Sequence, residues 1–435
     1  MTSRYLLALL ALLPTPASAA LGRIEAVMVK TVDAEQQRTA DFLARIVNQN
    51  SGTMNLAGVE AVRRMVEPEF QQLGFKTEWI DMKEAGRAGH LVARHTGNKR
   101  GKRLLLIAHL DTVFEPDSPF QRWQVEGNLA HGPGAGDDKG GIAVIIAALR
   151  AMQAAGTLKN ANITVFLTGD EEDAGPPLAI SRRDLIAEGK KADVALDFED
   201  LATDDGPNGL VDMGSIARRS AGSWTLTVTG HSAHSAGVGA GNYGAIYELA
   251  RIIDQFRREL PDDRLTYNVG LIGGGQSAAF DPGRIRLEAT GKTNIIAATA
   301  TARGDLRALS QEQIERTRSK MRAIVAQSLV GTKAEISFDE DSYPPMPPTA
   351  GSRALLAQLN AVNRDMGLAE MGELDPSKRG AGDISFVAAD VDGLVGLGPS
   401  SDGSHTDQEV VDLPSIPKQA KRAAILMSRL AAERR

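Results

Sequence analysis

The sequence predicts an α/β protein, a mostly parallel sheet with helices on both faces, interrupted by a smaller inserted α+β domain. Short apolar runs, such as residues 104–108, are typical of strands buried on both faces of a sheet. Segments with helical apolar spacing separate these runs, and this alternation is typical of α/β folds. The pattern changes after residue 215, because residues 224–228 alternate strictly between apolar and polar side chains, as a half-exposed antiparallel strand does.

The elements are expected in the following order. The first helices cover residues 33–48 and 58–73, and Gly74 suits the end of the second because glycine adopts left-handed conformations readily. Before the insertion, strands are expected over residues 76–80, 90–95, 103–108, 163–167 and 193–198, and a helix over 139–155. Within it, strands are expected over residues 224–228, 265–271, 284–288, 293–298 and 301–306, and helices over 243–256 and 310–329. An apolar strand over residues 393–397 belongs to the main domain again.

The N-terminus has the three regions of a secretory signal peptide. Arg4 supplies a positive charge, residues 5–13 form an apolar run too short to span a bilayer, and residues 17–19 form a small-x-small cleavage site. We expect cleavage near Ala19 and a periplasmic or secreted protein. The predicted organisation is a signal peptide over residues 1–19, a main domain in two parts over 20–215 and 335–435, and an inserted domain over 216–334.

Composition narrows the class of protein and the chemistry of its site. At 435 residues the chain is too long for one ordinary core, which favours two domains. A net charge of −6 argues against nucleic-acid binding, and no further apolar segment predicts a membrane anchor. The chain has no cysteine, so a bound metal must be held by histidine, aspartate and glutamate.

Polar loops that follow the predicted strands carry the candidate chemistry. His109 ends a buried strand, and Asp111 is close enough in sequence to orient its imidazole. Ligands bind at the carboxyl ends of strands in such sheets, so we expect these loops to meet. Histidines and carboxylates together suit a pair of divalent cations such as zinc, and one of two adjacent glutamates can remain free as a general base. The other loops cover residues 132–141, 168–173, 198–200 and 403–407.

The combination of motifs resembles the co-catalytic zinc hydrolases that include glutamate carboxypeptidase, acetylornithine deacetylase, succinyl-diaminopimelate desuccinylase and the aminoacylases. The motifs are His-x-Asp-Thr-Val from His109, Gly-x-x-Asp-x-Lys-Gly-Gly around Asp137, Asp-Glu-Glu at residues 170–172, and a late loop with His405. The resemblance implies a zinc-exopeptidase catalytic domain, two zinc ions per subunit, and an inserted lid that also forms a homodimer. The implied reaction is hydrolysis of a small peptide or N-acyl amino acid.

The resemblance also implies a role for each matching residue. Glu171 resembles the general base, and Asp111 the partner that orients His109. His234 matches a histidine that steadies the oxyanion from the neighbouring subunit. Asn294 and Arg307 match lid residues that contact the substrate carboxylate, and Gly382 lies in the matching glycine-rich substrate loop, residues 380–383. The implied metal ligands are His109, the bridging Asp137, Glu172, Glu199 and His405. His90 and His95 are instead expected to be exposed residues of their strand.

Some residues depart from the pattern and leave alternatives open. Glu199 is followed by Asp200 where the family usually has proline, so Asp197 is a rival ligand. The basic residue that some carboxypeptidase relatives carry near residues 343–348 is absent. A glutamate carboxypeptidase-like exopeptidase is the favoured function. An N-acyl-amino-acid deacylase, an aminopeptidase and a metal-bearing binding protein with a decayed site are the alternatives.

Overall fold

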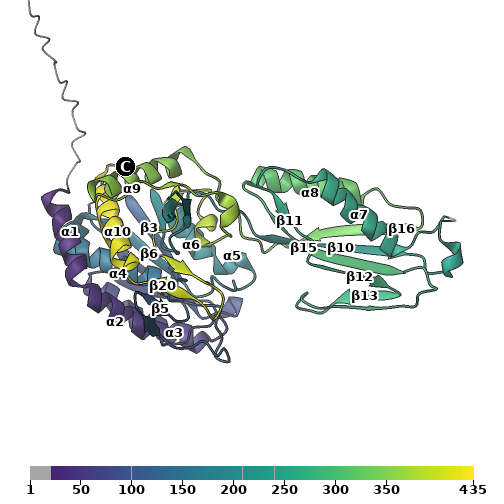
Figure 1. Ribbon diagram of the computed structural model, residues 1–435, viewed down its shortest axis with the longest axis horizontal. Coiled ribbons are helices and arrows are strands. Elements are labelled where there is room, and N and C mark those ends of the chain that lie inside the picture. Colours follow the sequence, from purple (N-terminus) through teal and green to yellow (C-terminus); the bar gives the residue numbers. More distant parts are fainter. Residues whose placement is uncertain (1–20, 99, 208, 240) are drawn as a thin grey trace, which may run out of the picture.

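A computed structural model describes residues 21–435 except residues 99, 208 and 240 (Figure 1). The predicted signal peptide lies outside the described residues. No helix in the described part of the chain has the length and apolar character of a membrane span. Two units lie side by side along the long axis of the molecule, and they are joined by two connecting segments (Figure 1). Below they are called the larger unit and the smaller unit.

The larger unit is built on a six-stranded sheet in the order β1-β2-β6-β3-β7-β18. The pairs β6·β3, β3·β7 and β7·β18 are parallel, whereas β1 and β2 form an antiparallel edge. This mixed but mainly parallel sheet confirms the predicted α/β class. The strands are β1 (Lys76–Asp81), β2 (Gly89–His95), β3 (Arg103–His109), β6 (Asn162–Thr168), β7 (Val194–Asp197) and β18 (Gly393–Leu394).

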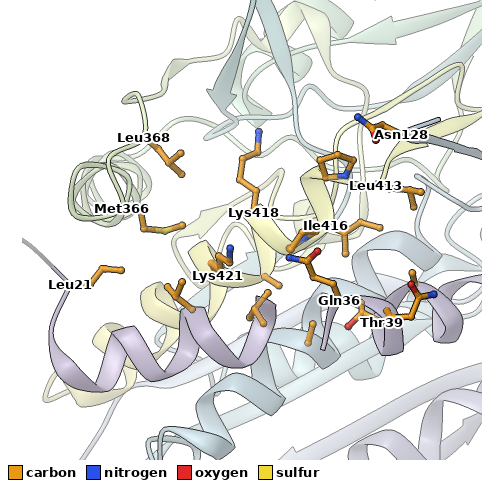
Figure 2. A pocket seen from close by; sticks show the side chains of 18 residues that line it. Leu21, Gln36, Thr39, Asn128, Met366, Leu368, Leu413, Ile416, Lys418 and Lys421 are labelled. Atoms are coloured by element: carbon orange, nitrogen blue, oxygen red, sulfur yellow. The ribbon is translucent and has the colours of Figure 1, made fainter. Parts of the chain in front are cut away.

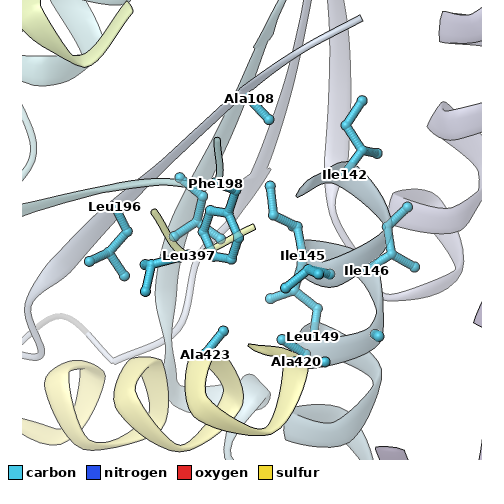
Figure 3. Close-up of a cluster of buried hydrophobic side chains, with 14 of the residues drawn as sticks. Ala108, Ile142, Ile145, Ile146, Leu149, Leu196, Phe198, Leu397, Ala420 and Ala423 are labelled. Carbon is cyan, nitrogen blue, oxygen red and sulfur yellow. The ribbon is translucent and has the colours of Figure 1, made fainter. Parts of the chain in front are cut away.

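One face of this sheet is covered by α4 (Lys139–Ala154) and α10 (Ser415–Ala432) (Figure 3). Side chains of both helices, such as Ile145 and Ala423, meet Leu196 of β7 in one apolar cluster. Each fully buried Ile or Leu there contributes about 1.5–3 kcal/mol to folding. Other helices complete the unit: α1 (Arg23–Ala34), α2 (Gln36–Val47), α3 (Leu56–Gln72), α5 (Leu178–Ser181), α6 (Arg183–Gly189) and α9 (Ala350–Asp365).

Local signals in the sequence explain where one of these helices begins and ends. The side chain of Asn55 caps α3 by accepting a hydrogen bond from the Gly58 N–H at 3.1 Å. The helix ends before Gly74, whose φ of 86° reverses the chain as predicted. The expected helix over residues 33–48 is instead divided, because the chain bends at Glu35 between α1 and α2.

The smaller unit has a five-stranded antiparallel sheet with its own core. Trp224, Leu226 and Val228 of β10 point inward and are fully buried, as the strict alternation predicts. The predicted strand over residues 293–298 is wrong, because that segment forms only an isolated bridge at Ile295. The elements are β10 (Gly222–Gly230), β11 (Thr266–Tyr267), β12 (Leu271–Gly275), β15 (Thr299–Arg307), β16 (Thr332–Phe338), α7 (Ala245–Glu259) and α8 (Gln311–Val325), with the hairpin β13 (Ser277–Phe280) and β14 (Leu287–Thr290).

The two connecting segments, residues 215–221 and 339–347, run beside each other. Antiparallel bridges join Arg218 to Met346 and Ala221 to Tyr343. The predicted domain boundary after residue 334 falls inside β16, so the return connection begins after Phe338. Short strands extend the larger unit near these segments and near the late loop: β4 (Gln124–Glu126), β5 (Leu129–His131), β8 (Thr203–Gly206), β9 (Gly209–Gly214), β17 (Gly372–Glu373), β19 (Ser401–Asp402) and β20 (Val410–Asp412).

Candidate active site

Three of the predicted metal ligands come together at the carboxyl edge of the larger sheet. His109 ends β3, Glu172 follows β6, and Asp137 lies in the glycine-rich loop before α4. One potential ligand atom from each lies within 4.8 Å of the others. The parallel pairing of β3 with β6 explains why His109 and Glu172 lie close together, because it brings residues 109 and 168 side by side.

Asp137 lies between two imidazoles. Its Oδ1 is 3.0 Å from His109 Nε2, and its Oδ2 is 3.3 Å from His405 Nε2. His405 Nε2 also lies 3.0 Å from Glu172 Oε2, although 57% of the His405 side chain is exposed. His405 has a φ of 67°, a left-handed conformation that costs a non-glycine residue about 1 kcal/mol or more. A carboxylate with one imidazole at each oxygen has the arrangement of a bridging ligand.

Asp111 organises two ligand-bearing loops at once. His109 Nδ1 lies 3.2 Å from the backbone carbonyl oxygen of Asp111 and 3.4 Å from its Oδ1, which leaves Nε2 of His109 directed at Asp137. The same carboxylate accepts hydrogen bonds from the backbone N–H groups of Glu171 and Glu172, each at 3.1 Å, and from the Thr53 hydroxyl at 2.7 Å. Burial raises the pKa of Asp111, but the hydrogen bond with His109 and these further bonds lower it more, so it stays ionised.

Some carboxylates of the site lack a compensating positive charge within the part of the chain that the structure describes, although at Asp137 burial is outweighed by the two imidazoles beside it, which lower its pKa. Burial, and then the charge of Glu199, raise the pKa of Glu171 well above its usual range. Burial raises the pKa of Glu172 to about 7. Both carboxylate oxygens of the fully buried Asp138 lack a hydrogen-bond partner among the described residues. A group of buried carboxylates and imidazoles with this deficit fits a bound divalent cation.

Glu199 and its rival Asp197 both lie beside Arg218, a residue that sequence reasoning missed. Arg218 Nη1 is 2.6 Å from Glu199 Oε2 and 3.6 Å from Asp197 Oδ2. Glu199 is only 8% exposed but does not belong to the three-residue group above. The altered residue Asp200 pairs with Arg379 and accepts a hydrogen bond from the Ser401 hydroxyl at 3.1 Å. Asp200 thus has partners of its own, separate from the predicted metal ligands.

Glu409 is a second residue that sequence reasoning missed. Its carboxylate accepts hydrogen bonds from the backbone N–H groups of Gly134 at 3.2 Å, Gly136 at 3.0 Å and Asp137 at 3.2 Å. It therefore holds the loop that presents Asp137. The one signal in the sequence that could have pointed to Glu409 was its position four residues after His405, in the same late loop.

The substrate residues predicted in the smaller unit lie apart from this centre. His234 and Asn294 are exposed in the smaller unit, where His234 Nδ1 accepts a hydrogen bond from the Ala236 N–H at 3.2 Å. Within the described part of this one chain, neither residue has a hydrogen bond or ion pair with the predicted metal ligands. Arg307, at the end of β15, has its Nη1 3.9 Å from the position that a Cβ on Gly380 would occupy.

Gly382 lies against the site, where a larger residue would have to displace two side chains. A Cβ there would come within 2.3 Å of Arg218 Nη1 and 2.7 Å of Glu199 Oε1. The glycine-rich loop therefore passes directly over the predicted ligand Glu199. Its last residue, Asp383, points into the core and pairs with the buried Arg182 at 2.8 Å.

One histidine outside the site, His90, has a position that differs from the one expected from sequence. His90 was expected at the surface of its strand, yet it is fully buried between β1 and β6. Its Nε2 lies 2.8 Å from the Ser181 carbonyl oxygen, which satisfies the ring in the core. Burial lowers the pKa of His90, so the ring is neutral.

A cavity of about 670 Å³ lies elsewhere in the larger unit, between α1, α2 and α10 (Figure 2). Its described lining is mainly apolar, with residues such as Met366 and Ile416, and contains no histidine or carboxylate. It therefore offers no metal ligand, and its two lysines, Lys418 and Lys421, are paired with Asp212 and Asp33. The candidate active site is the carboxyl edge of the sheet.

Fold and site together define a metal-dependent hydrolase with two adjacent glutamates at its centre. Residues 105–429 match the model of peptidase family M20/M25/M40, and the chain belongs to that family. It is 27% identical over 427 residues to carboxypeptidase G2 of Pseudomonas sp., covering 93% of this chain and 92% of the relative. It is 32% identical over 182 residues to succinyl-diaminopimelate desuccinylase of Rhodospirillum centenum, covering 39% of this chain and 45% of the relative.

Solved structures share the fold. The aminopeptidase PepT of Bacillus cereus has a TM-score of 0.73 at 18% identity and covers 91% of this chain and 99% of its own. An M20 family metallo-carboxypeptidase of Sulfolobus solfataricus has a TM-score of 0.64 at 14% identity, with coverage of 91% and 99%. These likenesses confirm the architecture of sheet, helices and inserted unit.

Proposed function

We propose that this protein is an exported di-zinc exopeptidase of the carboxypeptidase type, which releases an amino acid with a free carboxylate from a small peptide or N-acyl amino acid. The observation that supports this most is Asp137 between His109 and His405, beside the adjacent pair Glu171 and Glu172. Similarity to carboxypeptidase G2 along 93% of the chain supports the choice of reaction.

In this proposal His109, Asp137, Glu172, His405 and Glu199 hold the metal pair. Bound zinc supplies acidification of a water molecule and polarisation of the scissile carbonyl. Binding would require Glu199 to turn from Arg218 toward the ions. Arg218 would then retain its hydrogen bond to the Gly380 carbonyl, at 2.8 Å in the structure.

Glu171 moves the proton. Its neighbour Glu172 binds metal, and its own carboxylate remains free to accept a proton from the attacking water and to deliver it to the leaving amine. Burial favours the protonated form of Glu171 once it has accepted that proton. His234, supplied by the smaller unit of a second subunit, donates a hydrogen bond to the developing oxyanion.

Specificity for a free carboxylate would come from the glycine-rich loop, residues 380–383, and from the residues that face this loop. Arg307 lies close to Gly380 and offers a guanidinium for bidentate recognition, with Asn294 as a further donor. Closure of the smaller unit over the glycine-rich loop would exclude water from the reaction. A homodimer through the smaller unit is part of this proposal, because His234 has to come from the partner copy.

The test is hydrolysis of a substrate panel by the purified mature chain, with and without a chelator. Dipeptides and N-acyl amino acids with acidic, apolar or basic C-terminal residues are each paired with their C-terminally amidated forms. We expect zinc-restored cleavage that requires the free carboxylate. Preference for N-acyl amino acids over peptides would favour a deacylase, and cleavage of amidated peptides with free N-termini an aminopeptidase. Zinc binding without turnover would favour a binding protein.

Export is tested separately. The full-length chain is expressed in a bacterium, and the N-terminus of the mature protein is determined by mass spectrometry of periplasmic and culture fractions. A protein that begins near Ala20 in either fraction agrees with the proposal. An intact N-terminus in the cytoplasmic fraction contradicts it. Size-exclusion chromatography with light scattering tests the homodimer.

A further inference from the structure

One connecting segment places a tyrosine directly behind the proposed general base. The Tyr343 hydroxyl donates a hydrogen bond to the backbone carbonyl of Glu171 at 2.9 Å. It accepts one from Arg182 Nη2 at 3.1 Å. The Tyr343 backbone is fixed at the same time, because its N–H and C=O pair with Ala221 on the other connecting segment at 2.9 and 3.1 Å.

Arg182 holds this tyrosine from a fully buried position. Its Nη1 donates to Asp170 Oδ1 at 2.6 Å, and its Nε donates to Asp383 Oδ1 at 2.8 Å. The Thr168 hydroxyl donates to the other oxygen of Asp383 at 2.5 Å. The network therefore joins the end of β6, the loop of Glu171 and the glycine-rich loop. A buried network in which each member has its partners fixes geometry strongly.

The Tyr343 ring is held as firmly as its hydroxyl. It packs edge-on against Phe386, with ring centroids 4.8 Å apart. Removing the hydroxyl would leave this aromatic contact in place. Arg182 Nη2 would also keep its hydrogen bond to the Asp170 carbonyl at 3.0 Å. Loss of the hydroxyl would thus act mainly on the Glu171 carbonyl.

Glu171 depends on its backbone for its position. Its N–H is held by Asp111 at 3.1 Å and its carbonyl by Tyr343. Within the described part of the chain, its carboxylate makes no hydrogen bond that could orient it. The neighbouring Glu172, in contrast, has its carboxylate 3.0 Å from His405. The base is therefore aimed by two backbone contacts, and Tyr343 supplies one of them.

We propose that Tyr343 is a positioning residue for the reaction, whose hydroxyl holds the Glu171 peptide so that its carboxylate faces the reacting water. This inference rests on the proposed function, in which Glu171 is the general base. It gives the return connection from the smaller unit a role in aligning the site, in addition to joining the two units.

The test is Tyr343→Phe, with kcat expressed per folded, zinc-loaded molecule. We expect kcat to fall about tenfold, because a misplaced base reacts more slowly, while KM stays within about twofold. Bound zinc should not change. Tyr267→Phe is the matched control: its ring packs against the core of the smaller unit, and it should behave as the parent enzyme.

A second measurement separates positioning from general destabilisation. In a Glu171→Gln background, Tyr343→Phe should cause no further loss of kcat, because the group that it positions is already gone. An equal loss in both backgrounds, or reduced zinc content, would assign Tyr343 a structural role and overturn the inference. Unchanged kcat in Tyr343→Phe with an inactive Glu171→Gln overturns the inference alone. Full activity of Glu171→Gln overturns the proposed function and the inference with it.

Discussion

The larger unit holds its functional side chains in a buried network, whereas the smaller unit exposes those predicted for it. His109 is 1% exposed, and Asp111 is fully buried with hydrogen bonds from two backbone N–H groups and Thr53. His234 and Asn294 are exposed in the smaller unit. The difference indicates that the predicted metal ligands are positioned within one chain. In the proposed function, contacts to the substrate would form only on closure of the smaller unit or with a second copy.

The largest expected effect comes from Glu171 in the larger unit. Glu171→Gln should lower kcat about 10³-fold, because general base catalysis contributes between about 10² and 10⁴. Bound zinc and melting temperature should stay near those of the parent enzyme. Steady-state kinetics with zinc analysis provides the measurement. The control is Asp173→Asn, which removes a nearby carboxylate whose side chain is 63% exposed. Full activity of Glu171→Gln would assign the base elsewhere.

The comparison between the units is tested most directly at His234. His234→Ala should lower kcat about 10²-fold, as loss of an oxyanion donor does, with no change in zinc content or melting temperature. His231→Ala, three residues earlier and also exposed, is the control. If kcat is unchanged in a dimeric His234→Ala enzyme, His234 is not the oxyanion donor, and the smaller unit contributes at most to substrate binding.

Preorganisation of the metal centre is tested at Glu409. Glu409→Gln replaces one acceptor oxygen with an NH₂ group that faces backbone N–H donors, so the Asp137 loop should loosen. Zinc affinity should fall about 10- to 100-fold, the usual effect of losing a group that orients ligands. Competition with a fluorescent chelator measures it. Glu373→Gln, at an exposed carboxylate paired with Arg353, should leave zinc affinity unchanged.

The smallest expected effect concerns stability of the larger unit rather than its chemistry. Burial raises the pKa of Asp212, but Arg422 and Lys418 lower it more, so the folded pKa lies below the ordinary value. The ionised carboxylate therefore adds stability above that ordinary value, about pH 4, and this is lost as pH falls through the folded pKa.

The measurement is the melting temperature of the parent and of Asp212→Asn between pH 3 and pH 7. The variant should be less stable at neutral pH by no more than about 1 kcal/mol, because solvent screens a partly exposed pair. The two curves should converge at the acid end. A difference that persists unchanged to pH 3 would show that the effect of the substitution does not come from charge.

Local sequence by itself determined much of the architecture. Apolar periodicity marks the buried strands, as in β3, and the alternation of Trp224, Leu226 and Val228 marks the exposed sheet of the smaller unit. Prediction from local sequence failed where a side chain is placed by a partner that is distant in the sequence. His90 reads as a surface residue, but the sheet places β1 on one side and β6 on the other, and the Ser181 carbonyl takes its ring nitrogen.

The motifs also determined which loops carry metal-binding chemistry, because residue type and strand ends can be read along the chain. Only the tertiary structure brought in Arg218, Glu409 and Tyr343. Glu409 and Tyr343 each contact a loop more than a hundred residues away in the sequence, and Arg218 contacts a loop beside the connecting segments. None of these belongs to a local motif with a fixed spacing. Hydrogen bonds between distant loops depend on how the whole sheet is assembled, so the residues that aim the site became visible only in the fold.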